Sequence, residues 1–115
     1  MAKHRLLTEF GIGTSLRRQD YTAAARRAVE DALWRNSINL AELFGQPKEA
    51  MLIDVEIAVQ QPDKVDCGAL KDVFPYGQVS VRAGFGGLDV PRPESPPTVI
   101  ANAAINVSLI LEPAP

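Results

Sequence analysis

Carboxylates in alternating segments are the first candidates for chemistry in this chain. Glu9 lies in residues 4–10 and Glu56 in residues 51–60, two segments in which apolar and polar residues alternate. Two carboxylates that face each other across neighbouring strands can serve as acid and base, because their repulsion raises the pKa of one. Lys64 follows the second segment, and a desolvated lysine beside a hydroxyl group can activate a nucleophile. Glu9, Glu56 and Lys64 are therefore the candidate catalytic residues, with solvated surface charges as the competing interpretation.

The stretch EFGIGTSLRRQD, residues 9–20, raises a second possibility. Its G-x-G spacing before a helix is the setting of a dinucleotide loop, but Leu16 stands where the third glycine belongs. The backbone N–H groups at a helix start still favour anions. We therefore expect this stretch to be either an ordinary turn or a ligand loop with four candidate binding residues, Gly11, Gly13, Thr14 and Ser15.

The pattern of the whole chain predicts one domain, residues 1–115, with an α/β fold. Alternation predicts four strands, and a helical period predicts two helices with a further helical turn at residues 37–45. A glycine- and proline-rich segment, residues 84–97, is expected to be a loop. The order β-α-β-α-β-β predicts a two-layer sandwich with both helices on one face of a four-stranded sheet. The expected strands are residues 4–10, 51–60, 78–83 and 98–111, and the expected helices are residues 21–36 and 66–74.

The strand pattern also predicts a face of the sheet that no helix covers. Arg82 and Asn102 fall on this face and are added to the candidate ligand-binding residues. A mixed polar and apolar sheet face is typical of a wet subunit interface or a cleft between subunits. We therefore expect a homo-oligomer, with a solvated sheet face as the alternative. The residues expected on this face are Arg5, Leu7, Glu9, Leu52, Asp54, Glu56, Ala58, Ser80, Arg82, Asn102 and Asn106.

Composition excludes several classes of protein. The net charge of −2 and the absence of a basic cluster argue against nucleic-acid binding. One cysteine and one histidine exclude an ordinary zinc site within one chain, so we predict neither a metal nor a cofactor. No apolar stretch approaches the ~18 residues of a membrane helix, and the first residues do not resemble a signal peptide. These features favour a cytoplasmic protein without membrane contact.

Four segments together resemble the Lin0512 family of conserved hypothetical bacterial proteins. They are EFGIGTSLRRQDYTAAARRAVEDAL, VEIAVQQPDKVD, FPYGQVSVRAGFGGLDV and VIANAAINV, and they cover nearly the whole chain. The resemblance implies a single small α/β domain and names no reaction. The layout alone is also similar to one repeat unit of the ring-opening amidohydrolases, an analogy of architecture.

Two functions remain open at this point. The first is a small oligomeric protein that binds an anionic or amide-bearing metabolite at a subunit interface, with hydrolysis as one outcome. The alternative is a non-catalytic subunit whose open sheet face docks another chain. A binding site requires convergent, partly buried charges, whereas a docking face requires a broad contact.

Overall fold

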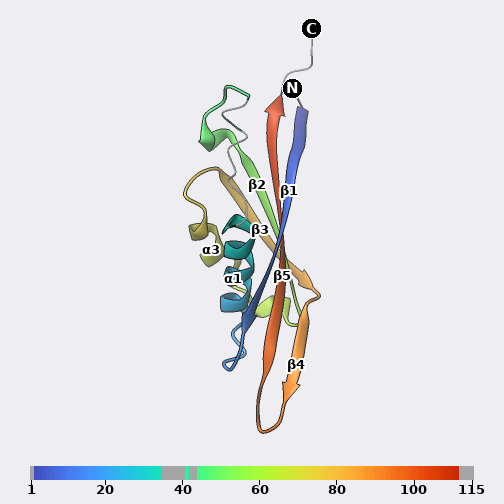
Figure 1. Ribbon diagram of the computed structural model, residues 1–115. Coiled ribbons are helices and arrows are strands. Elements are labelled where there is room, and N and C mark those ends of the chain that lie inside the picture. Colours follow the sequence, from blue (N-terminus) through green and yellow to red (C-terminus); the bar gives the residue numbers. More distant parts are fainter. Residues whose placement is uncertain (1, 35–40, 42–43, 112–115) are drawn as a thin grey trace.

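The computed structural model describes residues 2–34, 41 and 44–111, which form a mixed α/β fold (Figure 1). Five strands build one sheet, and two α-helices and three short 3₁₀ helices accompany it in the described part of the chain. Most of the helical turn predicted at residues 37–45 lies outside the described residues. The elements are β1 (Ala2–Ser15), α1 (Tyr21–Trp34), η1 (Lys48–Ala50), β2 (Leu52–Val59), η2 (Pro62–Lys64), α3 (Cys67–Leu70), η3 (Lys71–Val73), β3 (Gln78–Phe85), β4 (Leu88–Arg92) and β5 (Ser95–Leu111).

The sheet has the order β1-β5-β2-β3, and β4 pairs with the first part of β5. Strand β5 runs antiparallel to both β1 and β2, whereas β3 runs parallel to β2. The β1-α1-β2 connection therefore skips over β5, and the β2-α3-β3 connection joins neighbours. The two-layer arrangement with helices on one face is confirmed (Figure 1).

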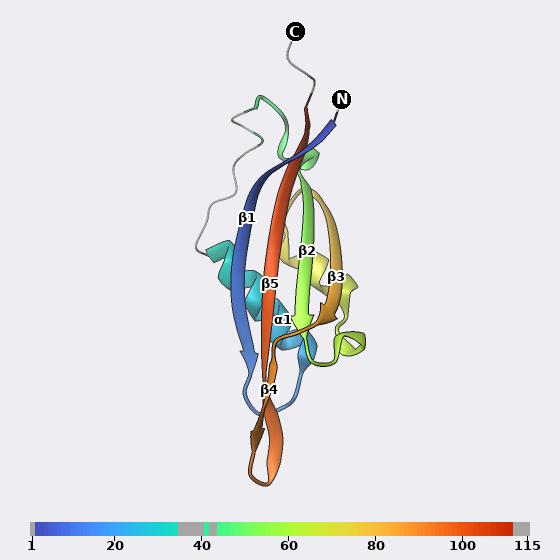
Figure 2. The ribbon, with the colours of Figure 1, turned by 90° about the vertical axis from the view of Figure 1, so that its right-hand side faces the viewer.

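The number of strands was predicted wrongly. Residues 88–92, expected within a loop, form β4 and pair with β5 from Leu88 opposite Ile100 to Arg92 opposite Ser95. The proline and glycine content of the segment hides this strand, because Pro91 interrupts the usual strand signal. The resulting hairpin extends beyond the rest of the sheet (Figure 2).

Helix α1 packs on the sheet through a stripe of small residues, as its period predicts. The buried side chains of this stripe are Tyr21, Ala24, Ala25, Ala28, Val29 and Ala32. Alternate residues of β2 and β5 meet them from the sheet, among them Ile53, Val55, Val99 and Ile105. Together they form one continuous apolar core between the two layers.

The first strand is longer than predicted, and this corrects the interpretation of the opening motif. Gly11 and Gly13 lie inside β1, opposite Ala103 and Ala101 of β5. A Cβ atom on Gly11 would lie less than 3.0 Å from backbone atoms of Ala28 and Ala32, and one on Gly13 equally close to α1. Glycine is therefore required here because the helix backbone rests directly on the strand. The two glycines therefore belong to a strand, and the chain bends only after Ser15, at residues 16–18.

A bulge in β1 changes which face its residues occupy. The pairing with β5 shifts between Arg5 and Leu7, so Arg5 lies opposite Ser108 and Leu7 opposite Val107. One extra residue in a strand reverses the alternation that follows it. Leu7 and Glu9 consequently lie on the helix side of the sheet, contrary to the prediction that placed them on the open face.

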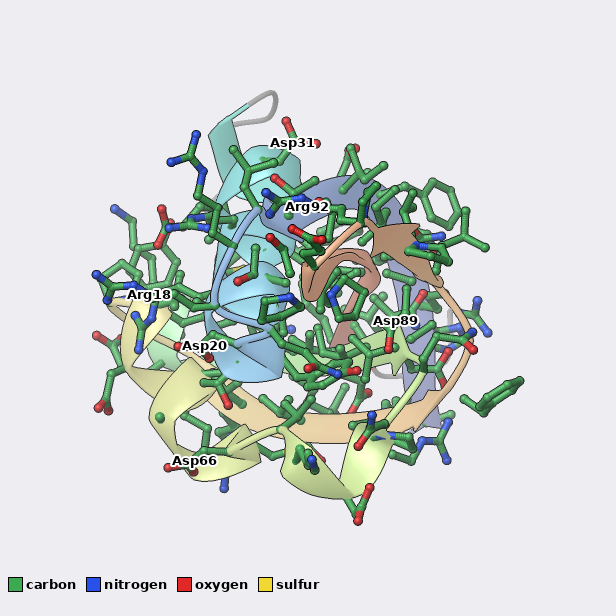
Figure 3. The ribbon with its side chains drawn as sticks, turned by 90° about the horizontal axis from the view of Figure 1, so that it is seen from below. Arg18, Asp20, Asp31, Asp66, Asp89 and Arg92 are labelled. Carbon is green, nitrogen blue, oxygen red and sulfur yellow. The ribbon has the colours of Figure 1, made fainter. Side chains whose placement is uncertain are left out.

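Short polar contacts fix the starts of both helices. The Asp20 carboxylate accepts a hydrogen bond from the Ala23 amide at 2.9 Å, and the Asp66 carboxylate accepts one from the Ala69 amide at 3.1 Å. These are N-caps, which satisfy amides that the helix itself leaves unpaired. The Thr22 hydroxyl links the two starts, since it accepts from the Asp66 amide at 2.9 Å. Figure 3 shows Asp20 and Asp66 at this end of the molecule.

Candidate functional site

One face of the sheet is free of helices, and we call it the open face (Figure 2). Residues directly opposite each other on neighbouring strands share a face, so the register defines rows across it. One row joins Thr8, Asn106, Asp54 and Ser80, and the next joins Phe10, Ala104, Glu56 and Arg82. Polar side chains gather where β1, β5, β2 and β3 all contribute, and apolar ones gather nearer the β4 hairpin.

The polar part of the open face contains a cleft of about 490 Å³, which we call the polar cleft. Three cationic and two anionic side chains line it, together with two hydroxyl groups and one amide. The cleft therefore carries one more positive than negative charge. Its lining residues are Lys3, Arg5, Asp54, Val55, Glu56, Ser80, Arg82, Asn106 and Ser108.

Both carboxylates of the polar cleft have cationic partners. The Lys3 ammonium group donates to the Asp54 carboxylate at 2.8 Å, and Arg82 pairs with Glu56 on the neighbouring strand. These side chains are between 41% and 77% exposed, so each pair contributes little to stability. Their effect is to leave Arg5 as the cation without a carboxylate partner among the described residues.

Three polar groups in the cleft retain hydrogen-bonding capacity. The Asn106 side-chain oxygen accepts from the Thr8 hydroxyl at 2.7 Å and from Arg5 at 3.5 Å, which fixes the amide orientation. Within the described residues, no acceptor is bonded to the Asn106 NH₂ group. Ser108 is only 2% exposed, and its hydroxyl group has no hydrogen-bond partner in the described part of the chain. Because these donors line the cleft without an acceptor among the described residues, the arrangement is suited to a ligand that accepts hydrogen bonds.

A second cleft, of about 450 Å³, continues from the first and shares Glu56 and Arg82 with it. We call it the apolar cleft. Phe10 is 68% exposed and Phe85 is 77% exposed, and both line this cleft. Its other lining residues are Ile57, Ala58, Gly84, Asn102, Ala103 and Ala104.

The predicted carboxylate pair of Glu9 and Glu56 does not exist. Strand β5 lies between β1 and β2, and Glu9 faces the helix layer while Glu56 faces the open side. The physical reason is the bulge after Arg5: it reverses the alternation of the residues that follow it in β1, so Glu9 is on the face opposite to the predicted one. Lys64 is also remote from Glu56: it ends η2 on the helix side, where its carbonyl accepts from the Thr22 hydroxyl at 3.4 Å.

The residues predicted to form an anion loop have structural partners instead. The Ser15 hydroxyl accepts from the Asp20 amide at 3.1 Å, and the Thr14 carbonyl accepts from Arg27 at 2.5 Å. Because Asp20 caps the helix with its own negative charge, the start of α1 presents no vacant anion site. Gly11 and Gly13 are covered by α1.

The structure does bring together Glu56, Arg82 and Asn102 on the open face: all three line the apolar cleft, and Glu56 and Arg82 also line the polar cleft. Sequence reasoning named Arg5, Ser80 and Asn106 on this face without assigning them a role. It missed Lys3 and Ser108. Ser108 follows the alternation of the last strand, so its hydroxyl group was detectable, but its burial depends on neighbouring strands.

Among the described residues, no group of three or more His, Cys, Asp or Glu side chains is arranged to hold a metal ion. Nor does any helix there have the length and apolar character needed to cross a membrane.

Comparison with known proteins places the chain in a family without assigning a reaction. The pattern of the conserved hypothetical protein family Lin0512 matches residues 5–107. A crystal structure of an FtsZ-like protein of unknown function from Nostoc punctiforme is similar, with 30% sequence identity and a TM-score of 0.86. The alignment covers 96% of this chain and 99% of that one. No curated protein matches. The chain belongs to the Lin0512 family of conserved hypothetical proteins.

Proposed function

We propose that this protein is a homo-oligomer that binds a small anionic or amide-bearing metabolite in the polar cleft, close to a subunit interface. The observation that carries the proposal is the Ser108 hydroxyl group, which lines a cleft with a surplus cation and has no partner among the described residues. A ligand carboxylate or carbonyl oxygen would satisfy this donor. It would also compensate the charge of Arg5.

The amide of Asn106 adds selectivity to this cleft. Its orientation is fixed by Thr8 and Arg5, so its NH₂ group is the part directed to a ligand. Charge-assisted and neutral donors placed together in this way suit a planar acceptor such as a carboxylate or a primary amide. The rim formed by Phe10 and Phe85 would contact an apolar portion of the ligand or of a second chain.

Binding is better supported than hydrolysis. A serine nucleophile needs a neighbouring base, and the carboxylates of the polar cleft, Asp54 and Glu56, are engaged by Lys3 and Arg82. Lys3 is the cationic partner of Asp54 and has no lone pair to accept a proton, while arginine remains protonated in proteins. We therefore assign the cleft a binding role.

Three small probes of equal size test the proposal: propionate, propionamide and propylammonium. Propionate and propionamide should shift the NMR signals of Arg5, Asn106 and Ser108, and propylammonium should not. The Arg5→Met variant should weaken propionate binding about 10-fold, because a charge-assisted hydrogen bond contributes roughly 1.5–3 kcal/mol.

The matched control is Lys71→Met, which removes an exposed cation from η3, outside the polar cleft. It should leave propionate binding unchanged. If both variants weaken propionate binding equally, the effect comes from net charge alone. If propionate shifts only the NMR signals of other surfaces, the ligand does not bind in the polar cleft.

The exposed aromatic residues favour a second candidate function, the docking of another protein chain on the open face. Phe10, Phe85 and Leu88 are each more than half exposed. If the open face is a docking surface, none of the three probes should shift the NMR signals of the polar cleft, and Phe85→Ser should lower the affinity for the partner chain.

A further inference from the structure

The two outer strands of the sheet differ in how their free edges are protected. On β1, the Ile12 amide donates to the Asp31 carboxylate at 3.0 Å, and the Thr14 carbonyl accepts from Arg27. Both side chains come from α1. They occupy backbone groups that would otherwise be available to another strand, which is a common way of protecting an edge.

Within the residues that the structure describes, strand β3 has no comparable protection. The Gln78 amide donates to the Met51 carbonyl at 2.8 Å, and the Gly86 amide donates to the Val59 carbonyl at 2.9 Å. The even-numbered residues of β3 therefore direct their N–H and C=O groups toward β2. The odd-numbered residues Val79, Val81 and Ala83 direct theirs outward, where no described residue bonds to them.

The sequence and regularity of β3 favour pairing at this edge. The strand is eight residues long, its ladder with β2 has no bulge, and it contains neither proline nor lysine. Bulges, prolines and lysines are features that usually prevent edge-to-edge association of strands. Figure 2 shows β3 as the outermost strand on its side of the sheet.

We propose that β3 pairs with β3 of a second copy of this chain, antiparallel and about a two-fold axis at Val81. The two sheets then become one continuous sheet. Such an interface is isologous, because each copy presents the same strand to the other. Addition of a strand to an exposed edge is an established mode of recognition, and here the added strand is identical.

The charge on β3 selects the register. Two registers pair the outward groups over most of the strand, with the axis at Val81 or at Arg82. An axis at Arg82 would place the two arginines directly opposite each other, which is destabilising. An axis at Val81 places Arg82 opposite Ser80 of the second copy and pairs Val79 with Ala83.

This pairing would complete the polar cleft. Ser80 and Arg82 line that cleft on its β3 side. In the dimer, Arg82 of the second copy lies beside Ser80, so the two clefts meet across the axis. The pairing follows from the edge geometry alone, whereas this consequence for the ligand rests on the proposed function.

Amide hydrogen exchange measured by NMR tests the pairing without any substitution. In the dimer, the amides of Val79, Val81 and Ala83 should be protected, and dilution to the monomer should abolish their protection. The amides of Ser80 and Arg82 are an internal control, because their bonds to β2 protect them in both states. Rapid exchange of the odd-numbered amides in the assembled protein would overturn the proposal.

A proline substitution provides the second test. The Val81 amide has no partner among the described residues, so Val81→Pro removes none of the ladder bonds between β3 and β2. The wild type should have twice the 12.5 kDa mass of the chain by native mass spectrometry, and Val81→Pro should have the single mass with an unchanged circular dichroism spectrum. The control Val81→Thr keeps the amide and should remain dimeric.

If Val81→Pro fails to fold, a substitution at the exposed residue Ser80 tests the pairing of β3 instead. Ser80→Arg places an arginine opposite Arg82 of the second copy and should weaken dimerisation at least about 10-fold. A monomeric wild type, or a dimer that resists both substitutions, would overturn the pairing. A monomer that still binds propionate would overturn the pairing and the homo-oligomer, and would leave the binding role of the polar cleft intact.

Discussion

At the scale of single residues, two glycines of β1 pack directly against the backbone of helix α1. Gly11 and Gly13 lie on β1 where α1 crosses it, and neither position has room for a side chain. The spacing of the two glycines matches the two-residue period of a strand, and their partners on the helix include Ala24, Ala28 and Ala32. A motif that resembles a phosphate loop is here a packing motif.

Gly13→Ala should therefore destabilise the protein severely. Its Cβ atom would lie less than 3.0 Å from backbone atoms of Ala24 and Ala28, so helix and strand would have to separate. Overpacking of this kind costs about 1–3 kcal/mol or more in the free energy of unfolding, which urea denaturation measures.

Gly84→Ala is the matched control for this prediction. It changes the same residue type in the same sheet, but no atom lies within 4 Å of the added carbon. We expect a change close to zero. Similar losses for the two variants would mean that strand propensity, and not contact with α1, determines the cost.

At the scale of elements, the sequence correctly predicted the features that depend only on the local spacing of apolar residues. The alanine stripe of α1, the alternation of β2 and the apolar side of β5 are all visible in short windows, and each was placed correctly. Local patterns are reliable where a single element presents one face to one core.

The features that sequence reasoning missed depend on contacts between distant segments. The bulge after Arg5 is set by the pairing of β1 with β5, and it moved Glu9 to the other face. Strand β4 exists because β5 provides it with a partner. The polar cleft combines four strands, so the alternation of one strand could indicate its polar side but not its members.

A part-buried polar cluster joins the β4 hairpin to the start of α1. The Tyr21 hydroxyl donates to the Asp89 carboxylate and accepts from Gln19 at 3.2 Å and Gln61 at 3.1 Å. Figure 3 shows Asp89 on the hairpin side of this end of the molecule. Burial, with the bond to Asp89 as a further cause, raises the pKa of Tyr21 above its usual value of 10.0.

Tyr21→Phe should cost about 1–3 kcal/mol at neutral pH, because it leaves the buried Asp89 without its donor. The difference in stability between wild type and variant should also depend on pH. Folding keeps the phenol protonated, whereas the unfolded chain loses this proton near pH 10. The difference should therefore be constant below pH 10 and shrink above it, as denaturation at several pH values will measure. A difference that is flat through pH 11 would contradict the raised pKa.

At the scale of the whole molecule, the chain is unusually elongated. Its extents are 63 × 22 × 19 Å, and its radius of gyration of 15.8 Å exceeds the roughly 13 Å of a compact domain of this length. The long β5 strand sets the long axis, and the hairpin with β4 extends it (Figure 2). Because the particle is elongated, side-by-side and end-to-end dimers of it differ clearly in maximum dimension.

Pairing through β3 predicts a particular shape for the dimer in small-angle X-ray scattering. The free edge of β3 runs along the long axis, so a second copy adds mainly to the width of the particle. The maximum dimension should therefore stay far below twice 63 Å, while the scattering mass doubles. Association through the projecting hairpins would instead join the copies end to end and nearly double that dimension. Because the two arrangements bury different strands, Val81→Pro should return the scattering curve to that of one chain only in the first. An end-to-end particle that is insensitive to Val81→Pro would place the interface on β4 and the first part of β5.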